Sequence, residues 1–190
     1  MSPVTHLLTG WIAASASTRL DHRARLVITI ASLAPDLDGL GIIPEVLTSG
    51  SNHPLLWYSS YHHVLCHNLA FGLVLVLAGW MIGARRWLTA FLVLLSFHLH
   101  LAGDLIGSRG PDGYGWPILY LYPFSDSCEL AWSRQWQLNA WPNYLITSVA
   151  LFAVLVLACR RGYSPLGILS ARADSVFVAT LRRWCKGYLA

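Results

Sequence analysis

The sequence contains few charged residues. Charged residues make up 12% of its 190 positions, against about 25% in a typical soluble domain. Lysine occurs once, at position 186, and no run of basic residues is longer than two. Although the formal net charge is +4, the basic residues are scattered rather than clustered, which argues against nucleic acid as a partner. An anionic lipid surface fits such a charge better.

Paired cysteines are also missing. The four cysteines stand apart and form no CxxC pair, so the sequence predicts neither a zinc ribbon nor a disulfide framework. The first eight residues contain no lysine or arginine, although a secretory signal peptide needs a basic start. The small residues after Trp11 resemble a cleavage site, but we expect this segment to stay in the protein.

Apolar residues are abundant. Hydrophobic residues account for 55% of the chain, which also holds nine Trp and eight Tyr. Aromatic rings of this kind are enriched where a protein meets the boundary between lipid and water. The composition therefore excludes a disordered chain, a coiled coil or an ordinary soluble domain and predicts an integral membrane protein.

Three apolar runs are close to the roughly 20 residues that a helix needs to cross a hydrocarbon core. They cover residues 64–83, 87–105 and 144–159. Two earlier runs, 7–18 and 26–34, are too short to cross alone, so we expect tilted or partial helices. The sequence predicts an all-α fold, an integral membrane helical bundle with about five hydrophobic helical segments. Residues 1–162 would form this domain and residues 163–190 an amphipathic cytoplasmic tail.

The arginines predict the orientation of this bundle. Eleven of the 13 basic residues fall in residues 19–25, 85–86 and the stretch from 160 onward. Placing these three stretches in the cytoplasm satisfies the positive-inside rule, provided that the two short N-terminal segments cross as a hairpin. Arg109 and Arg134 then lie on the outer side. The loop 109–142, with its tryptophans, should lie there too and cover the site described next.

In this orientation, histidines and aspartates gather on the outer side, at the ends of four separate segments. They are His6, Asp36, Asp38, His62, His63, His67, His100 and Asp104. Ionisable groups at membrane depth usually face a bundle interior or a wet cavity and indicate function. Neutral imidazole together with carboxylate suits zinc and related divalent ions. Because no cysteine belongs to the cluster, a structural zinc site is disfavoured.

The two most regular pairs each have a structural alternative. His100 and Asp104 are four residues apart, so they share one helix face and can reach one ion or simply hydrogen-bond to each other. Asp36 and Asp38 could hold a metal or could cap a solvated turn. His98 is about 200° around the helix from His100 at about 100° per residue, so we expect it to face neighbouring helices.

The histidines of residues 62–67 leave a choice open. His63 and His67 would share a helix face, whereas His62 would meet His67 only from the turn before the helix. Three histidines in six residues rarely serve packing alone. His6, taken by itself, is compatible with an ordinary interfacial histidine.

The order of these motifs resembles one family, the inner-membrane-bound metal-dependent hydrolases of bacteria (YdjM-like). The likeness covers roughly the first two-thirds of the chain, in the stretches PDLD (35–38), HHVLCHN (62–68), HLHLAGD (98–104), WP (116–117) and YPFS (122–125). The family's polar positions correspond to His6, Asp36, Asp38, His62, His67, His100 and Asp104. His63 stands where the family usually has Arg, so His63 could compete with His62 as a ligand.

The resemblance implies a metal-dependent hydrolase of the bacterial inner membrane, a multi-pass protein with its site facing the outer side. The divalent metal, which we expect to be zinc, would be held by Asp36, His62, His67, His100 and Asp104. Asp38 would be the general base for a metal-activated water, and His6 a further ligand or a group that orients the leaving group. Arg109 would hold a phosphate.

The substrate class is less defined than the site. A fainter likeness to zinc-dependent phospholipase C and related single-strand nucleases, limited to His100, Asp104 and the earlier positions, suggests phosphoester chemistry. Together with the membrane location, this predicts a membrane lipid or a lipid-linked phosphoester as substrate.

Two rival functions use the same residues. A metal- or proton-translocating protein would use the His/Asp cluster as a transport site, but the apolar runs 71–81 and 149–158 offer no polar path onward. Haem binding by paired histidines is disfavoured by the additional aspartates.

Overall fold

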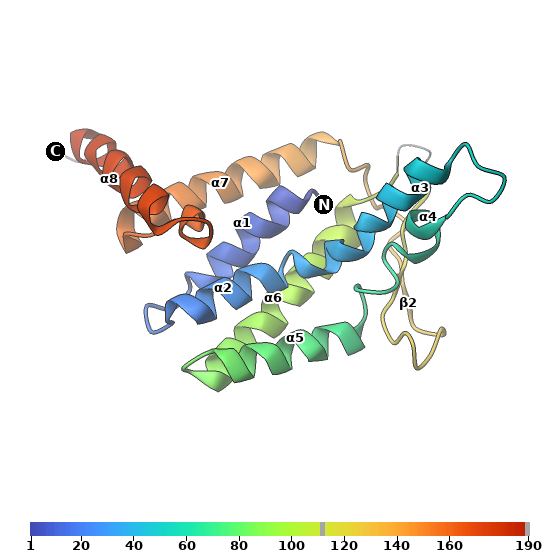
Figure 1. The fold of residues 1–190 in the computed structure, drawn as a ribbon. Coiled ribbons are helices and arrows are strands. Elements are labelled where there is room, and N and C mark those ends of the chain that lie inside the picture. The colour runs from blue at the N-terminus through green and yellow to red at the C-terminus, as the bar shows by residue number, and fades with distance from the viewer. Residues whose placement is uncertain (111–112, 189–190) are drawn as a thin grey trace.

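The computed structural model describes residues 1–110 and 113–188, and it confirms the all-α class (Figure 1). The chain forms helices α1 (Pro3–Ala14), α2 (His22–Ala31), α3 (Ile42–Thr48), α4 (Trp57–Tyr61), α5 (Leu69–Ile82), α6 (Arg86–Gly107), α7 (Trp141–Arg161) and α8 (Ala171–Tyr188). Two 3-10 helices, η1 (Ala34–Gly41) and η2 (Pro165–Ile168), lie between them. The short strands β1 (Ile118–Leu119) and β2 (Glu129–Leu130) pair antiparallel within the α6–α7 connection.

Side-chain caps explain where several helices begin. The Asp21 side chain accepts a hydrogen bond from the Ala24 amide at the start of α2. Asn68 does the same for the Phe71 amide at the start of α5, and its own amide group donates to the carbonyls of Val64 and Leu65. Because Asn68 holds residues 64–68 in a turn, α5 begins at Leu69. The predicted apolar segment 64–83 is therefore helical only in its second part.

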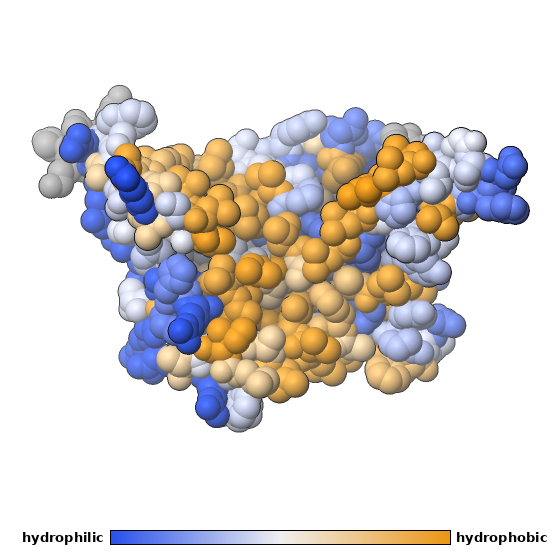
Figure 2. Space-filling view, viewed as in Figure 1, coloured by the Kyte–Doolittle hydropathy of each residue, from blue (hydrophilic) through white to orange (hydrophobic). Residues whose placement is uncertain are grey.

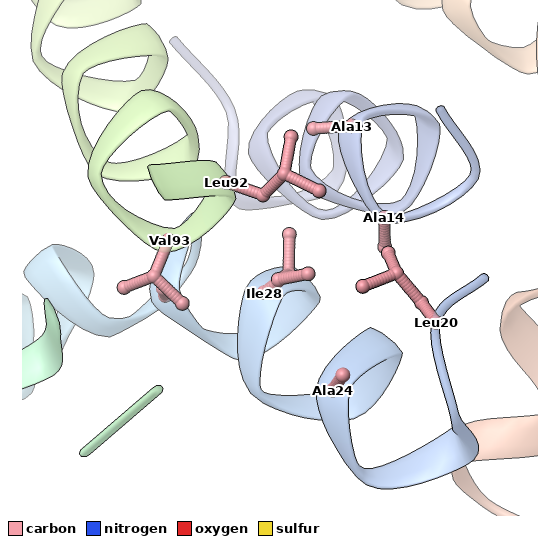
Figure 3. Packing of buried hydrophobic residues seen from close by; sticks show 8 residues of the cluster. Ala13, Ala14, Leu20, Ala24, Ile28, Leu92 and Val93 are labelled. Carbon is pink, nitrogen blue, oxygen red and sulfur yellow. The ribbon is translucent and has the colours of Figure 1, made fainter. Parts of the chain in front are cut away.

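Helix α6 lies at the centre of the bundle and packs against α1, α2 and α5. Small residues allow these helices to approach closely. The core between α1, α2 and α6 consists of Ala13, Ala14, Leu20, Ala24, Ile28, Ala31, Leu92 and Val93 (Figure 3). A Cβ atom at Gly72 of α5 would lie 2.6 Å from the Phe97 ring of α6, so only glycine fits this contact. Close approach through small residues is typical of helix packing in membranes.

Within the described residues, α6 and α7 are each long and apolar enough to cross a membrane. The pair formed by α2 and the segment Ala34–Thr48 also passes this test but is bent by 45°, and α5 is a shorter apolar helix of 14 residues. The apolar segments are thus confirmed, whereas the number that crosses stays a prediction. Figure 2 shows apolar side chains over the middle of the molecule and polar side chains gathered towards two ends.

The two ends of the bundle differ in their residues. The connections α1–α2, α5–α6 and α7–α8 lie at the left in Figure 1. These connections and the helix ends beside them hold most of the arginines: Arg19, Arg23, Arg25, Arg85, Arg86, Arg160 and Arg161. The start of α1, the helices α3 and α4 and the α6–α7 connection lie towards the other end. The predicted tail is a helix, α8, which packs on α7 and η2, and only residues 189–190 of the tail lie outside the described part.

Candidate metal centre

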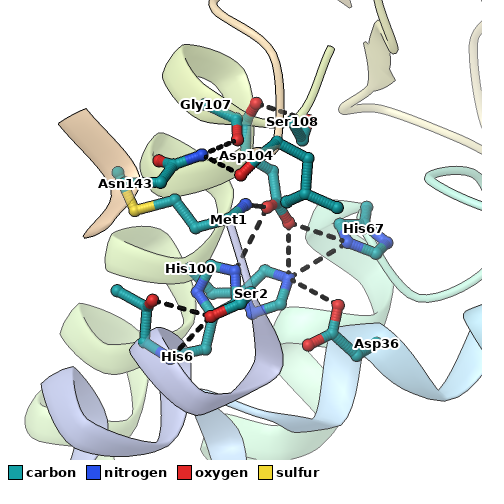
Figure 4. A network of polar contacts seen from close by, with 12 residues as sticks. Met1, Ser2, His6, Asp36, His67, His100, Asp104, Gly107, Ser108 and Asn143 are labelled. Carbon is teal, nitrogen blue, oxygen red and sulfur yellow. Dashed lines mark hydrogen bonds and ion pairs between the residues drawn. The ribbon is translucent and has the colours of Figure 1, made fainter. Parts of the chain in front are cut away.

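A buried cluster of histidines and aspartates fills the end of the bundle opposite the one that carries most of the arginines. Its members come from four places in the chain: His6 from α1, Asp36 from η1, His67 from the turn before α5, and His100 and Asp104 from α6 (Figure 4). The side chains of all except Asp36 are at most 2% exposed. The fold therefore brings together residues that lie up to 98 positions apart.

The backbone fixes the orientation of His100. Its Nδ1 lies 2.7 Å from the carbonyl oxygen of Ser32 at the end of α2. Because a carbonyl oxygen can only accept, Nδ1 carries the proton and donates it. In the neutral ring, the lone pair is then on Nε2, which lies 2.8 Å from Asp104 Oδ2. A hydrogen bond of this kind, which fixes the tautomer, is typical of histidines that bind metals.

Asp38 orients His67 in the same way. His67 Nδ1 donates to Asp38 Oδ2 at 2.9 Å, so its Nε2 faces His100 Nε2 at 3.1 Å and Asp104 Oδ2 at 3.3 Å. Burial opposes a charge on His67, but its hydrogen bonds to Asp104 and Asp38 outweigh burial and raise the pKa of His67 to about 9. Two imidazole Nε2 atoms and one carboxylate oxygen therefore converge on one point, where either a proton on His67 or a bound cation supplies the positive charge.

His6 and Asp36 extend this cluster. The ring of His6 stacks on that of His100 at 3.8 Å, and His6 Nε2 lies 3.1 Å from Asp104 Oδ1. Asp36 Oδ1 lies 3.8 Å from His100 Nε2. The α-amino group of Met1 also forms an ion pair with Asp104, so a cation already faces this carboxylate.

The structure differs from the sequence-based choice between His62 and His63. Residues 62–68 are not helical, and His63 has a backbone φ of +65°, a region that residues with a side chain rarely adopt. This conformation directs the buried His63 ring to the cluster, with Nε2 3.9 Å from Asp104 Oδ2. Burial lowers the pKa of His63 well below its ordinary value, so the ring is neutral, as a metal ligand must be.

Among the described residues, two groups of side chains could each hold a metal ion. One group is His6, Asp36, His100 and Asp104, and the other is His63, His67 and Asp104. His62, which the sequence favoured as a ligand, belongs to neither group. The physical reason is that His62 Nδ1 donates to Asp38 Oδ1 at 2.8 Å and its ring stacks on Tyr58.

Asp38 also differs from its predicted role as general base. Its side chain is fully buried, and both of its oxygens accept hydrogen bonds: Oδ1 from His62, and Oδ2 from His67 and the Cys66 amide. A carboxylate held in this way suits the orientation of two imidazoles better than proton transfer to a substrate.

A cleft of about 600 Å³ opens beside the cluster. Asp36, His63 and Asp104 line its inner end, and Arg109 and Trp116 of the α6–α7 connection line its rim. One guanidinium nitrogen of Arg109 donates to the Ser133 carbonyl at 2.8 Å. The Arg109 Nε is buried and has no hydrogen-bond partner within the described part of the chain. The connection thus covers the site as predicted, although residues 111–112 lie outside the description.

The sequence profile of the YdjM inner membrane protein family matches residues 1–185. The chain belongs to this family. No curated protein and no solved structure matches the chain. The likeness to zinc-dependent phospholipase C thus stays a prediction.

Membership of the YdjM family agrees with the composition and with the apolar helices. A family of inner membrane proteins, together with two or three helices able to cross a bilayer, establishes this chain as a membrane protein. The His/Asp cluster includes the last turns of α6, which is long and apolar enough to cross a membrane and which provides His100 and Asp104.

Several supporting residues of this YdjM protein were missed by sequence reasoning. Ser32 acts through its backbone carbonyl, which no side-chain pattern can reveal. Gln135 donates to the Asp104 carbonyl at 2.8 Å, and Asn143 donates to the Gly107 carbonyl at 2.8 Å, so both fasten the end of α6. Gln135 stands alone in the connection and Asn143 in the first turn of α7, so neither position gave a sequence signal.

His98 lies apart from the cluster, as its place on α6 predicted. Its Nδ1 donates to the Leu94 carbonyl at 2.8 Å, and its Nε2 lies 2.9 Å from the Tyr120 hydroxyl. His98 therefore provides a matched control for the histidines of the cluster.

Proposed function

We propose that this protein is a membrane-bound, metal-dependent hydrolase that acts on a phosphoester. The observation that carries this proposal is the convergence of His67 Nε2, His100 Nε2 and Asp104 Oδ2 within 2.8 to 3.3 Å of one another. Three acceptors at these distances repel one another unless a cation or a proton lies between them.

The donor set favours zinc among the divalent ions. Neutral imidazole and carboxylate are its usual ligands in catalytic sites, where three protein ligands leave a position open. Thiolate ligands, which would favour a structural site, do not belong to the described groups. When bound, the ion supplies a water of lowered pKa as the nucleophile.

The chain provides two further groups for hydrolysis. Asp36 Oδ2 is buried without a hydrogen-bond partner among the described residues, and Asp36 lines the cleft beside His100. In this position, Asp36 either completes the ligand set or accepts the proton of the attacking water. Arg109 lines the cleft, and its buried Nε has no partner within the described part of the chain, so its guanidinium is the group that binds a phosphate oxygen of the substrate.

Two hollows, each lined in part by η1 and α4, support a lipid-linked substrate. Besides the polar cleft, an apolar groove of about 270 Å³ is lined by Leu37, Leu40, Trp57 and Leu65, with Asp38 in its wall. These four apolar side chains are exposed. A substrate with a phosphate head group and an apolar chain would place its head in the cleft and its chain in the groove.

The same arrangement supports the orientation in the inner membrane. We place the metal centre at the outer side, because the arginine-rich helix ends and connections lie at the opposite end of the bundle. Translocation of a metal or proton is disfavoured, because the buried core of Ile28, Leu92 and Val93 lies along α6 between the centre and the arginines.

The test uses detergent-purified protein. We expect bound zinc by elemental analysis, and hydrolysis of bis-p-nitrophenyl phosphate or of a phospholipid in mixed micelles that a chelator abolishes and zinc restores. The His98→Gln variant should retain both metal and activity. Protein that neither contains nor takes up a divalent ion contradicts the metal centre, and metal-loaded protein that hydrolyses neither substrate contradicts the hydrolase.

A further inference from the structure

We propose that the centre holds two divalent ions and that Asp104 bridges them. This inference rests on the proposed metal centre and adds the number of ions and the ligands of each. The first site would use His6, Asp36 and His100, and the second would use His63 and His67.

The two oxygens of Asp104 face different partners. Oδ1 lies 3.1 Å from His6 Nε2, whereas Oδ2 lies 2.8 Å from His100 Nε2, 3.3 Å from His67 Nε2 and 3.9 Å from His63 Nε2. The two groups of candidate ligands share Asp104 and no other residue. His6 and the two histidines of the second group thus face different oxygens of Asp104, while His100 of the first group also lies beside Oδ2. A carboxylate in this position can give one oxygen to each of two ions.

The number of ligands exceeds what one ion takes. A catalytic zinc ion uses three protein ligands and a water, whereas the two groups contain six different residues within the described chain. Three of their atoms are buried without a hydrogen-bond partner among the described residues: Asp36 Oδ2 in the first group, His63 Nδ1 in the second, and Oδ2 of the shared Asp104. Each group therefore contains a buried polar atom of its own that lacks a partner, beside the one that the two groups share.

The charge of the centre supports a second ion. Asp36, Asp38 and Asp104 place three carboxylates in or directly behind the cluster, with side chains 20%, 0% and 2% exposed. The Met1 α-amino group pairs with Asp104 Oδ1, so an ion bound at this oxygen displaces the ammonium. One divalent ion then leaves this buried region negative when the histidines are neutral. Two divalent ions and one hydroxide balance the three carboxylates, which lowers the cost of burying them.

The backbone conformation of His63 supports a functional role for the second site. A φ of +65° is costly for a residue with a side chain, and such conformations persist where surrounding structure holds them, often at functional sites. A pair of ions about 3.5–4 Å apart stabilises both the attacking and the leaving oxygen of a phosphoester.

The experiment counts ions without relying on activity. Metal-free protein in detergent is titrated with Mn²⁺ and followed by electron paramagnetic resonance, and zinc is counted by elemental analysis after zinc loading. We expect two ions per chain and a spin-coupled manganese pair in the unaltered protein. His63→Asn, chosen because asparagine tolerates a positive φ, and His6→Gln should each keep one ion and lose the coupled signal.

Asp104→Asn removes the bridging charge and should lower the binding of both ions, whereas His98→Gln should keep two. One ion in the unaltered protein overturns the bridged pair while leaving the proposed hydrolase intact. If His63→Asn and His6→Gln each release all metal while helical content is preserved, the bridged pair is likewise overturned and the proposed hydrolase is left intact. No metal in the unaltered protein contradicts the proposed function itself.

Discussion

At the scale of the residue, the centre is organised by hydrogen bonds behind the ligand atoms. The Ser32 carbonyl holds His100, and Asp38 holds His62 and His67, each through Nδ1. These bonds direct the Nε2 atoms of His67 and His100 to Asp104 before any ion arrives. Preorganisation of this kind raises metal affinity, because less freedom is lost on binding.

Asp38→Asn tests the orienting role of this carboxylate. One amide oxygen cannot accept from His62, His67 and the Cys66 amide as two carboxylate oxygens do. We expect zinc affinity to fall about 10- to 100-fold, measured by competition with a chelator of known affinity. A fall in the turnover number with unchanged zinc affinity would instead support the general-base role that the sequence predicted.

At the scale of the element, the centre depends on how closely α1 and α2 pack. A Cβ atom at Gly10 of α1 would lie 2.4 Å from Ser32 Cβ at the end of α2. The Ser32 hydroxyl also donates to the His6 carbonyl, so the same contact joins both helices to the cluster. Glycine at position 10 therefore sets the distance between α1, which carries His6, and the end of α2, where the Ser32 carbonyl orients His100.

Gly10→Ala should push α1 away from α2. Overpacking of a tight contact costs about 1–3 kcal/mol, so we expect a lower midpoint of thermal unfolding in detergent and weaker zinc binding. Gly50→Ala is the matched control, because no atom lies within 4 Å of a Cβ there. Equal effects of the two substitutions would show that the contact is not tight.

At the scale of the whole molecule, apolar packing and the polar centre are separate in space. The buried core of α1, α2 and α6 is aliphatic, and the ligand-bearing ends of the same helices lie beyond it. The fold should therefore persist without metal.

The tail is also separate from the centre. Ser164 and Asp174 hydrogen-bond at 2.6 Å and fasten η2 to α8, away from the centre.

Removal of residues 164–190 should leave the protein in the membrane fraction, because α6 and α7 remain. Fractionation followed by carbonate extraction measures this directly. Recovery of the shortened chain in the soluble fraction would mean that the tail anchors the protein.

The orientation can be tested by labelling the α6–α7 connection. Ser127→Cys, in a variant whose four native cysteines are replaced by serine, puts one exposed thiol on this connection. In intact spheroplasts, a membrane-impermeant maleimide should label it, because the arginine-rich end faces the cytoplasm. Labelling that requires lysis would reverse the predicted topology.

Much of this protein was determined by the sequence alone. The apolar runs required helices and a membrane, because neither disorder nor a soluble domain is compatible with so little charge. The spacing of His100 and Asp104 placed both on one face of α6, since helix geometry is local. The order of the polar motifs also identified the family that the profile confirms.

Only the tertiary structure decided how the remaining polar residues are used. His62 and His63 are neighbours in the sequence, but the positive φ of His63 and the hydrogen bond from His62 to Asp38 separate their positions. Asp36 and Asp38 differ for a similar reason, since one lines the cleft and the other lies behind the histidines. These distinctions depend on contacts between residues far apart in the chain, and local spacing carries no information about them.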